Sequence, residues 1–177
     1  MMRIVCVVAT AALLAACGQS AQTPQARPNT PAPAARVCND VSINPAVRAE
    51  IGAMVEVSTA PALLGGPITP GTYDLVRIAP RGGSTPPSEA VWESLRVRES
   101  ESGVTLDFAV AVGAADAAPI RSTARLEEGP PARLIRTCGG EGASMVSWEA
   151  SGVELRLVLP GRAGRGQDSL TFVRRAG

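Results

Sequence analysis

The chain has 177 residues, enough for one domain of ordinary size. Its 17 basic residues, all arginine, nearly balance its 16 acidic residues, and it contains neither lysine nor histidine. The balanced charge argues against nucleic acid as a partner, because proteins that bind polyanions show a basic excess. The absence of histidine excludes Ser–His and Cys–His catalytic pairs, so we expect a protein that is not an enzyme.

Residues 1–16 have the pattern of a secretory signal peptide. Arg3 provides a positive start, and the uncharged, mostly apolar run that follows ends at Ala16. This run is shorter than the roughly 20 residues that a membrane-spanning helix needs, and it has the length of the apolar region of a signal.

The end of this run, Leu14-Ala15-Ala16-Cys17, resembles the lipobox of bacterial lipoproteins. The resemblance implies cleavage before Cys17, a diacylglyceryl group on its sulfur and a fatty acid such as palmitate on the new amino terminus. Two or more acyl chains give stable anchoring. Gly18, in place of aspartate, implies an outer-membrane address that faces the periplasm or the cell surface. The alternative is an ordinary signal peptide that happens to contain a cysteine.

Residues 17–36 comprise Cys17 and a linker rich in Pro, Ala and Gln, without any aliphatic side chain larger than alanine after the cysteine. Such a segment cannot form a core and is predicted to be a disordered tether. The folded domain is expected to span 37–177.

Cys38 and Cys138 are the two cysteines that remain in the predicted domain. In an oxidising compartment they are expected to form a disulfide, with two buried free thiols as the alternative. Two cysteines without histidine fall short of the usual four ligands of a structural metal site, so we predict no metal and no cofactor.

Asn44-Pro45 resembles a helix start, and Val47, Ile51 and Met54 follow at helical spacing. A short helix at about 45–55 is therefore predicted. A strand is the competing interpretation, because Val55-Glu56-Val57 alternates.

From Gly71 onward apolar and polar residues alternate, which is typical of strands with one buried face. Turns rich in Gly, Pro and Ser separate about eight such segments, and no long helical pattern lies between them. The sequence therefore predicts an all-β fold, an antiparallel up-and-down barrel, with a two-sheet sandwich as the alternative. The segments are TYDLVRIA, AVWESLRVRES, VTLDFAVAV, PIRSTARL, ARLIRTC, SMVSWEA, VELRLVLP and SLTFVRR.

GGPITPGTYDLVRI, RTCGG, SWEASGVELRLVLP and the final SLTFVRR together resemble a group of small bacterial lipoproteins with lipocalin-like barrels. The likeness covers about 67–177. It implies a fold and a cellular location rather than an activity.

Carboxylate pairs are the remaining acid–base candidates: Glu99 with Glu101, Glu127 with Glu128, or Asp74 with a neighbour. Solvated turn charges are the preferred interpretation of the two glutamate pairs. The outward arginines Arg96, Arg98, Arg121 and Arg125 are expected to form cross-strand ion pairs rather than a binding stripe. GRAGRGQ at 161–167 is interpreted as a hairpin loop, with weak contact to anionic lipid headgroups as its functional alternative.

The function expected is therefore a lipid-anchored envelope protein whose barrel binds a small apolar molecule or an envelope protein. Alternatives are a solidly packed structural barrel and a carboxylate-dependent hydrolase or isomerase. An interior void of several hundred cubic ångströms would favour ligand binding over the structural role. The candidate lining residues are Tyr73, Leu106, Phe108, Leu155, Leu157 and Phe172.

Overall fold

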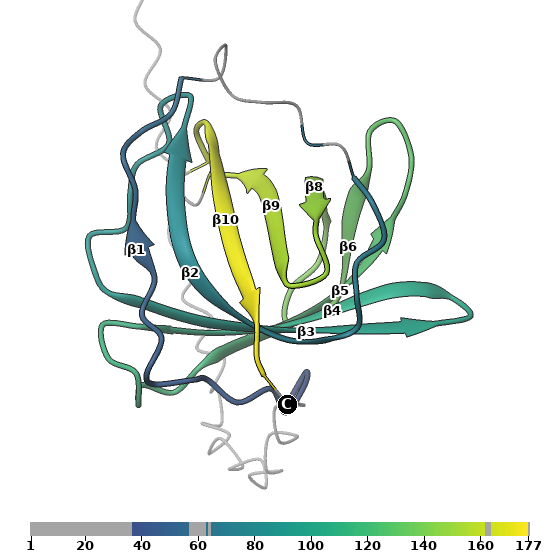
Figure 1. Ribbon diagram of the computed structural model, residues 1–177, viewed down its shortest axis with the longest axis horizontal. Coiled ribbons are helices and arrows are strands. Elements are labelled where there is room, and N and C mark those ends of the chain that lie inside the picture. The colour runs from purple at the N-terminus through teal and green to yellow at the C-terminus, as the bar shows by residue number, and fades with distance from the viewer. Residues whose placement is uncertain (1–36, 57–62, 64, 162–163, 177) are drawn as a thin grey trace, which may run out of the picture. The chain divides into compact units, whose positions relative to one another are not determined.

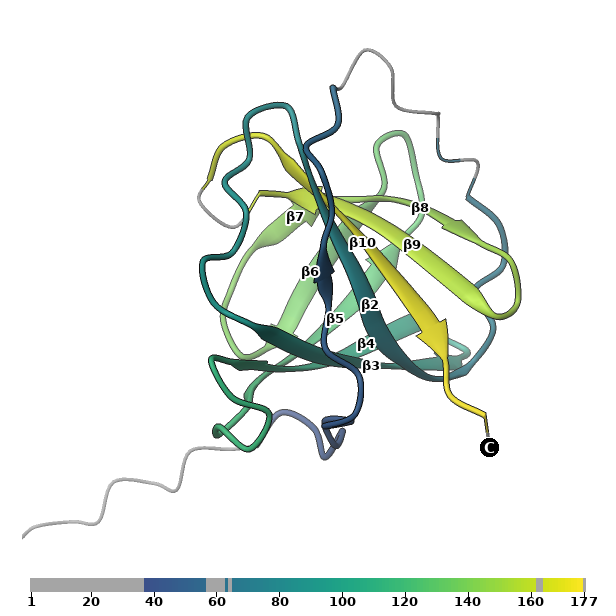
Figure 2. The same ribbon diagram turned by 60° about the vertical axis from the view of Figure 1, so that its left-hand side comes forward.

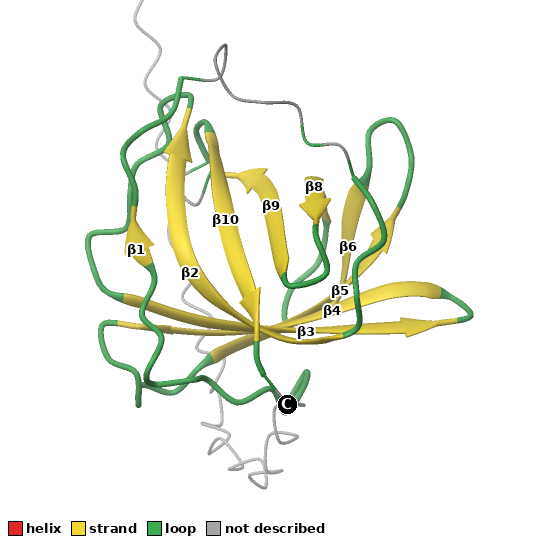
Figure 3. Ribbon diagram, viewed as in Figure 1, coloured by secondary structure: helices red, strands yellow, loops and turns green. Residues whose placement is uncertain are grey.

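The computed structural model describes residues 37–56, 63, 65–161 and 164–176, which contain strands, turns and loops but no helix (Figures 1 and 3). The predicted signal peptide, Cys17 and the linker lie outside the described residues. The strands are β1 (Glu50–Ile51), β2 (Gly71–Arg81), β3 (Val91–Ser100), β4 (Gly103–Val112), β5 (Ile120–Glu127), β6 (Arg133–Cys138), β7 (Ala143–Met145), β8 (Ser147–Ala150), β9 (Glu154–Pro160) and β10 (Gln167–Arg174).

Strands β2 to β10 form an antiparallel up-and-down barrel that is nearly closed, which confirms the predicted fold class. Their order in the sheet is β7-β6-β5-β4-β3-β2-β10-β9-β8. The two end strands, β7 and β8, are separated in sequence by Val146 alone; β7 pairs with β6 and β8 pairs with β9. The predicted strand SMVSWEA is thus broken at Val146. Before this residue the chain pairs with β6, and after it the chain pairs with β9, so the two ends of the sheet come together.

The strand alternation places one apolar face of every long strand inside the barrel, where it forms the core. The largest side chains without exposed surface come from β2, β3, β4, β9 and β10. Burial of each contributes about 1.5–3 kcal/mol to the free energy of folding. They include Tyr73, Leu75, Ile78, Leu95, Leu106, Leu155, Leu157 and Phe172.

The helix predicted at about 45–55 is wrong. Asn44 opens a turn instead: its side-chain oxygen accepts a hydrogen bond from the amide of Ala46 at 3.2 Å. Beyond this turn the chain extends, and β1 pairs in parallel with Arg77 and Ile78 of β2. Helical spacing was present, but a short isolated helix is marginal on its own, whereas an open strand edge offers backbone partners and tertiary packing.

This edge is open because β2 and β3 pair only between Gly71 and Asp74 before they diverge. The N-terminal segment fills the gap (Figures 1 and 2). Ala49 donates its amide to the carbonyl of Val91 on β3 at 2.9 Å, while Gly52 donates to Ile78 on β2 at 2.8 Å.

Upstream of the gap, residues 37–44 form a strap over the outer face of β3, β4 and β5. Cys38 forms the predicted disulfide with Cys138, the last residue of β6, at a Cα–Cα distance of 5.5 Å. Asn39 donates to the carbonyls of Phe108 at 3.2 Å and Ser122 at 2.9 Å. The strap is therefore attached to several neighbouring strands by the disulfide and by side-chain hydrogen bonds.

Asp107 lies under the strap and has no exposed surface. It accepts hydrogen bonds from Arg98 at 2.8 and 3.1 Å and from Thr123 at 2.8 Å. Burial alone raises the pKa of Asp107, but the hydrogen bonds from Arg98 and Thr123 and the nearby arginine charges outweigh it and lower the pKa below its usual value. The carboxylate therefore stays ionised, as a buried charge with partners must.

Asp74 is a second buried carboxylate with an arginine partner, and it holds Arg175 near the C-terminal end of the chain. Arg175 donates to its two oxygens at 2.7 to 3.0 Å, and Asn44 and Ser94 donate to them as well. Burial raises the pKa of Asp74, yet these hydrogen bonds and the Arg175 charge bring its pKa below the ordinary value.

Candidate functional site

The barrel interior is solidly packed toward one end and hollow toward the other. Tyr73, Leu106, Leu155, Leu157 and Phe172, which we expected to line a ligand site, have almost no exposed surface and pack against one another within the core cluster. The Tyr73 hydroxyl donates to the carbonyl of Thr69 at 2.6 Å, so its polar end is already satisfied. These side chains fill the barrel and do not border the hollow.

The hollow is a cavity of about 510 Å³, and Phe108 is the predicted lining residue that borders it. This volume lies within the range typical of sites for small molecules. Its walls come from β3 to β7 and from β9 and β10, so strands on both sides of β2 in the sheet surround it. The apolar lining is Phe108, Val110, Val112, Ile120, Ala124, Leu134, Leu159, Pro160 and Leu170; the polar lining is Glu93, Ser122, Arg136, Ser144 and Asp168.

The cavity opens at the end where the β4–β5, β6–β7 and β9–β10 connections lie. Val112 and Ile120, at the ends of their strands, are 39% and 71% exposed and form an apolar part of the rim. GRAGRGQ is the β9–β10 connection, as predicted from the sequence, although residues 162 and 163 lie outside the described part.

Gly139 borders the same opening, directly after the disulfide cysteine Cys138. Its φ is +79°, and a Cβ at this position would lie 2.3 Å from the backbone oxygen of Arg121. Only glycine fits this approach without a shift of the backbone. The backbones at the end of β6 and the start of β5 are therefore in close contact at this part of the rim.

Two buried carboxylates, Glu93 and Asp168, lie on the cavity wall with exposures of 5% and 2%. Asp168 accepts a hydrogen bond from the hydroxyl of Ser84, which is also buried. The sequence reasoning missed both residues, although the signal was present. Glu93 alternates in step with Val91 and Leu95 and therefore lies on the same inward face of its strand. Asp168 does so with Leu170 and Phe172.

The carboxylates proposed from the sequence lie elsewhere. Glu127 forms ion pairs with Arg125 at 2.6 Å and Arg133 at 3.1 Å. Asp74 is held by Arg175, and Glu99 and Glu101 are exposed near the β3–β4 turn. None of them lines the cavity.

The predicted cross-strand ion pairs are found for Arg96 and Arg98, whereas the Arg125 pair lies within one strand and Arg121 has no carboxylate partner among the described residues. Arg96 contacts both Asp40 and Asp107, Arg98 contacts Asp107, and Arg125 contacts Glu127. Arg121 donates instead to Asn39 and to the carbonyl of Val41 in the strap. These side chains hold the barrel surface together rather than present a basic stripe.

Within the described part of the chain, no three His, Cys, Asp or Glu side chains are grouped so that they could hold a metal ion. The same residues include no helix that is long and apolar enough to cross a membrane.

Comparisons with known proteins found no family model, no curated protein and no solved structure that matches this chain. Its function is therefore inferred from the geometry of the barrel and from the sequence motifs.

Proposed function

We propose that this protein is a lipid-anchored envelope lipoprotein whose barrel binds a small, mostly apolar molecule in its open end, without catalysing a reaction. The observation that carries the proposal is the cavity of about 510 Å³ inside the barrel. A solidly packed structural barrel would have no such space. The alternative partner for the same opening is an envelope protein in place of a small molecule.

The lining indicates the character of the ligand. Its apolar side chains come from strands on both sides of β2, so a bound molecule would be enclosed by Phe108, Leu134 and Leu170. Removal of apolar surface from water contributes about 25 cal/mol per Å², which is enough to hold a small hydrophobic molecule. Glu93 on β3 and Asp168 on β10 each add a carboxylate to this wall, and such a polar group would orient a ligand with one polar end.

The anchor part of the proposal is supported by the lipobox-like Leu14-Ala15-Ala16-Cys17 and by the proline-rich linker that follows it. The resemblance to lipocalin-like bacterial lipoproteins agrees with the observed barrel. Together they favour a periplasmic or surface position on the outer membrane, with acyl chains on Cys17 as the membrane contact.

Native mass spectrometry of the protein purified from its host tests the binding proposal. We expect a retained small molecule that disappears in Ser144→Trp, because Ser144 lines the cavity and an indole there would occupy it. Ser147→Trp is the matched control, because Ser147 is exposed on β8 and does not line the cavity. A wild-type mass without an adduct would contradict ligand binding and favour the structural role.

Membrane fractionation tests the anchor independently. The Cys17→Ser protein should leave the membrane fraction, since it lacks the sulfur that would carry the lipid. Equal retention of both proteins in the membrane would contradict the anchor and leave the ligand proposal intact.

A carboxylate-dependent hydrolase or isomerase is the second candidate, and one observation favours it: Glu93 and Asp168 are buried on the wall of the same cavity. Incubation of the retained molecule with fresh protein distinguishes the two functions. Conversion that is lost in Glu93→Gln and Asp168→Asn would support catalysis, whereas recovery of the molecule unchanged would support binding alone.

A further inference from the structure

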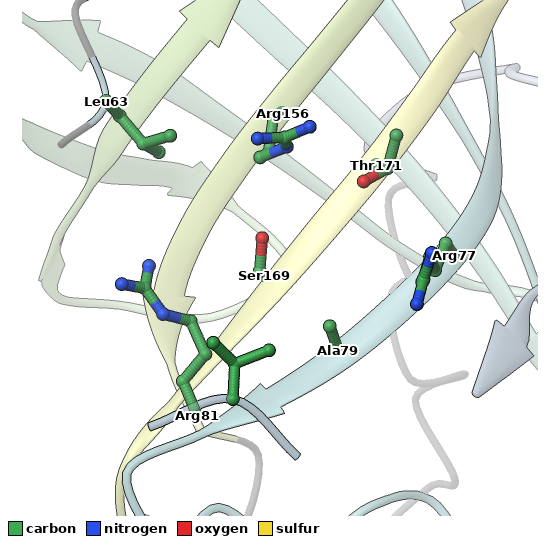
Figure 4. A pocket seen from close by; sticks show the side chains of 8 residues that line it. Leu63, Arg77, Ala79, Arg81, Arg156, Ser169 and Thr171 are labelled. Carbon is green, nitrogen blue, oxygen red and sulfur yellow. The ribbon is translucent and has the colours of Figure 1, made fainter. Parts of the chain in front are cut away.

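The outer face of β2, β9 and β10 carries a second concavity, separate from the barrel interior (Figure 4). It encloses about 200 Å³. Arg77 and Arg81 rise from β2, Arg156 from β9, and Ser169 and Thr171 from β10 between them. Val55 and Leu63 add an apolar border, and none of the described residues that line the groove is a carboxylate.

The sheet register puts the charged and hydroxyl groups in line. Thr171 is the register partner of Arg77 on one side and of Arg156 on the other. With strands about 4.8 Å apart, the backbones of the two arginines are about 10 Å apart, with the threonine hydroxyl between them. Ser169 stands two residues further along the same face of β10.

Most outward arginines of this barrel have a carboxylate partner, but Arg77 and Arg81 form no ion pair within the described residues. Glu50 is the register partner of Arg77, yet their side chains make no ion pair. The Nε of Arg81 is buried and has no hydrogen-bond partner among the described residues. A buried donor without a partner is unfavourable, so an acceptor that binds at this point would restore the missing hydrogen bond.

Arg156 is only partly engaged. Its contacts to Glu149 and Glu154 are 3.5 and 3.4 Å long, at the weak limit of hydrogen bonding. A guanidinium has five donors, so Arg156 keeps donors that can turn toward a ligand in the groove.

We propose that this groove binds a phosphate group, as inorganic phosphate or as the headgroup phosphate of an anionic lipid. Guanidinium forks match the oxygens of phosphate, and the hydroxyls of Ser169 and Thr171 add neutral donors at its centre. The apolar border of Val55 and Leu63 would suit a phosphate attached to a hydrophobic body. Among the described residues, none lines both this groove and the barrel cavity, so the proposal does not depend on the proposed function.

Binding is measured on the full chain with Cys17→Ser, so that no acyl anchor contributes. The first arm titrates inorganic phosphate by calorimetry. The second arm measures co-sedimentation with phosphatidylcholine vesicles that contain, or lack, phosphatidic acid. Phosphate binding in the first arm identifies the free anion as sufficient, whereas binding in the vesicle arm alone identifies the lipid headgroup; either supports the site.

Arg77→Gln and Arg81→Gln should each weaken binding about tenfold or more, the factor that corresponds to loss of a charge-assisted hydrogen bond. Arg77→Lys should recover part of it, because lysine restores the charge but not the fork. Arg48→Gln is the matched control, since it removes the same charge from an exposed position outside the groove. Circular dichroism and thermal melting confirm that each variant is folded.

Binding that is equally strong in Arg77→Gln, Arg81→Gln and Arg48→Gln would overturn the proposal, because it would show a diffuse charge effect. Absence of binding in both arms would overturn it as well.

Discussion

The two ends of the barrel interior are built from the same alternation but differ in what fills them. Toward one end Tyr73, Leu75, Leu95 and Phe172 meet from β2, β3 and β10 and leave almost no exposed surface. Toward the other, the inward positions of β5 and β7 hold Ser122, Ala124 and Ser144. These small side chains do not reach the barrel axis, so the cavity remains. The size of the inward residues, rather than their polarity alone, decides which end keeps an open cavity.

The largest expected difference between the two ends is in the cost of removing an aromatic ring. Phe172→Ala in the packed end should lower the free energy of unfolding by about 3–5 kcal/mol, because the ring leaves a void that its neighbours cannot fill. Phe108→Ala only enlarges an existing cavity, and its cost should be smaller. Urea unfolding of both variants measures the difference. Equal losses would show that the two ends are packed alike.

The disulfide Cys38–Cys138 ties the strap to the open end, and its removal should cost about 2–4 kcal/mol because it closes a separation of 100 residues. In the variant with both cysteines replaced by serine, hydrogen exchange should increase in the strap and β6. The amides of β2 and β10 in the packed end should change less. Uniform acceleration across all strands would argue against an effect confined to the open end.

Acid should destabilise the barrel through Asp74 and Asp107, whose folded pKa values lie below their ordinary values. A depressed folded pKa contributes stability above the unfolded pKa of about 3.9, and that stability is lost as the pH falls through the folded pKa. The free energy of unfolding should therefore decrease below about pH 4. Asp107→Asn should show a shallower decrease than wild type in the same range. Identical pH profiles for the two proteins would remove Asp107 from this account.

The smallest expected effect is a gain in stability at the open end. Ala124→Leu would extend an inward side chain into the cavity and should stabilise the barrel by about 1 kcal/mol. It should also reduce ligand retention, because the added side chain occupies the same space. A loss of stability measured by thermal melting would mean that the wall around Ala124 cannot accept more volume.

Sequence periodicity was sufficient for the barrel and its strands because a half-buried strand must alternate, whatever its neighbours are. It was insufficient for 45–55, where helical spacing and a capping asparagine were present but an open edge of β2 was available for pairing. Local preference lost to a tertiary contact that no local pattern encodes. The division of SMVSWEA at Val146 likewise reflects closure of the sheet rather than any break in the alternation.

The candidate site was predictable only in part. Phe108 was identified because it is large, apolar and on the inward face, but the same criteria selected Tyr73 and Phe172, which fill the core. The strand alternation also placed Glu93 and Asp168 on the inward face, but carboxylates were assumed to be solvated. The groove of Arg77, Arg81 and Arg156 joins strands far apart in sequence and therefore had no local signal.

The amino-acid sequence was enough to establish the strand periodicity, the alternating inner and outer faces and the lipobox-like motif, because each depends on residues close together in the chain. It also led us to expect the Cys38–Cys138 disulfide, which the structure contains. Which inward positions pack together and which leave a cavity became evident from the folded barrel alone. The tertiary structure also decided which arginines meet carboxylates and which gather in a groove. Both outcomes depend on the register between strands and on how the sheet closes, and the chain's local pattern leaves register and closure open.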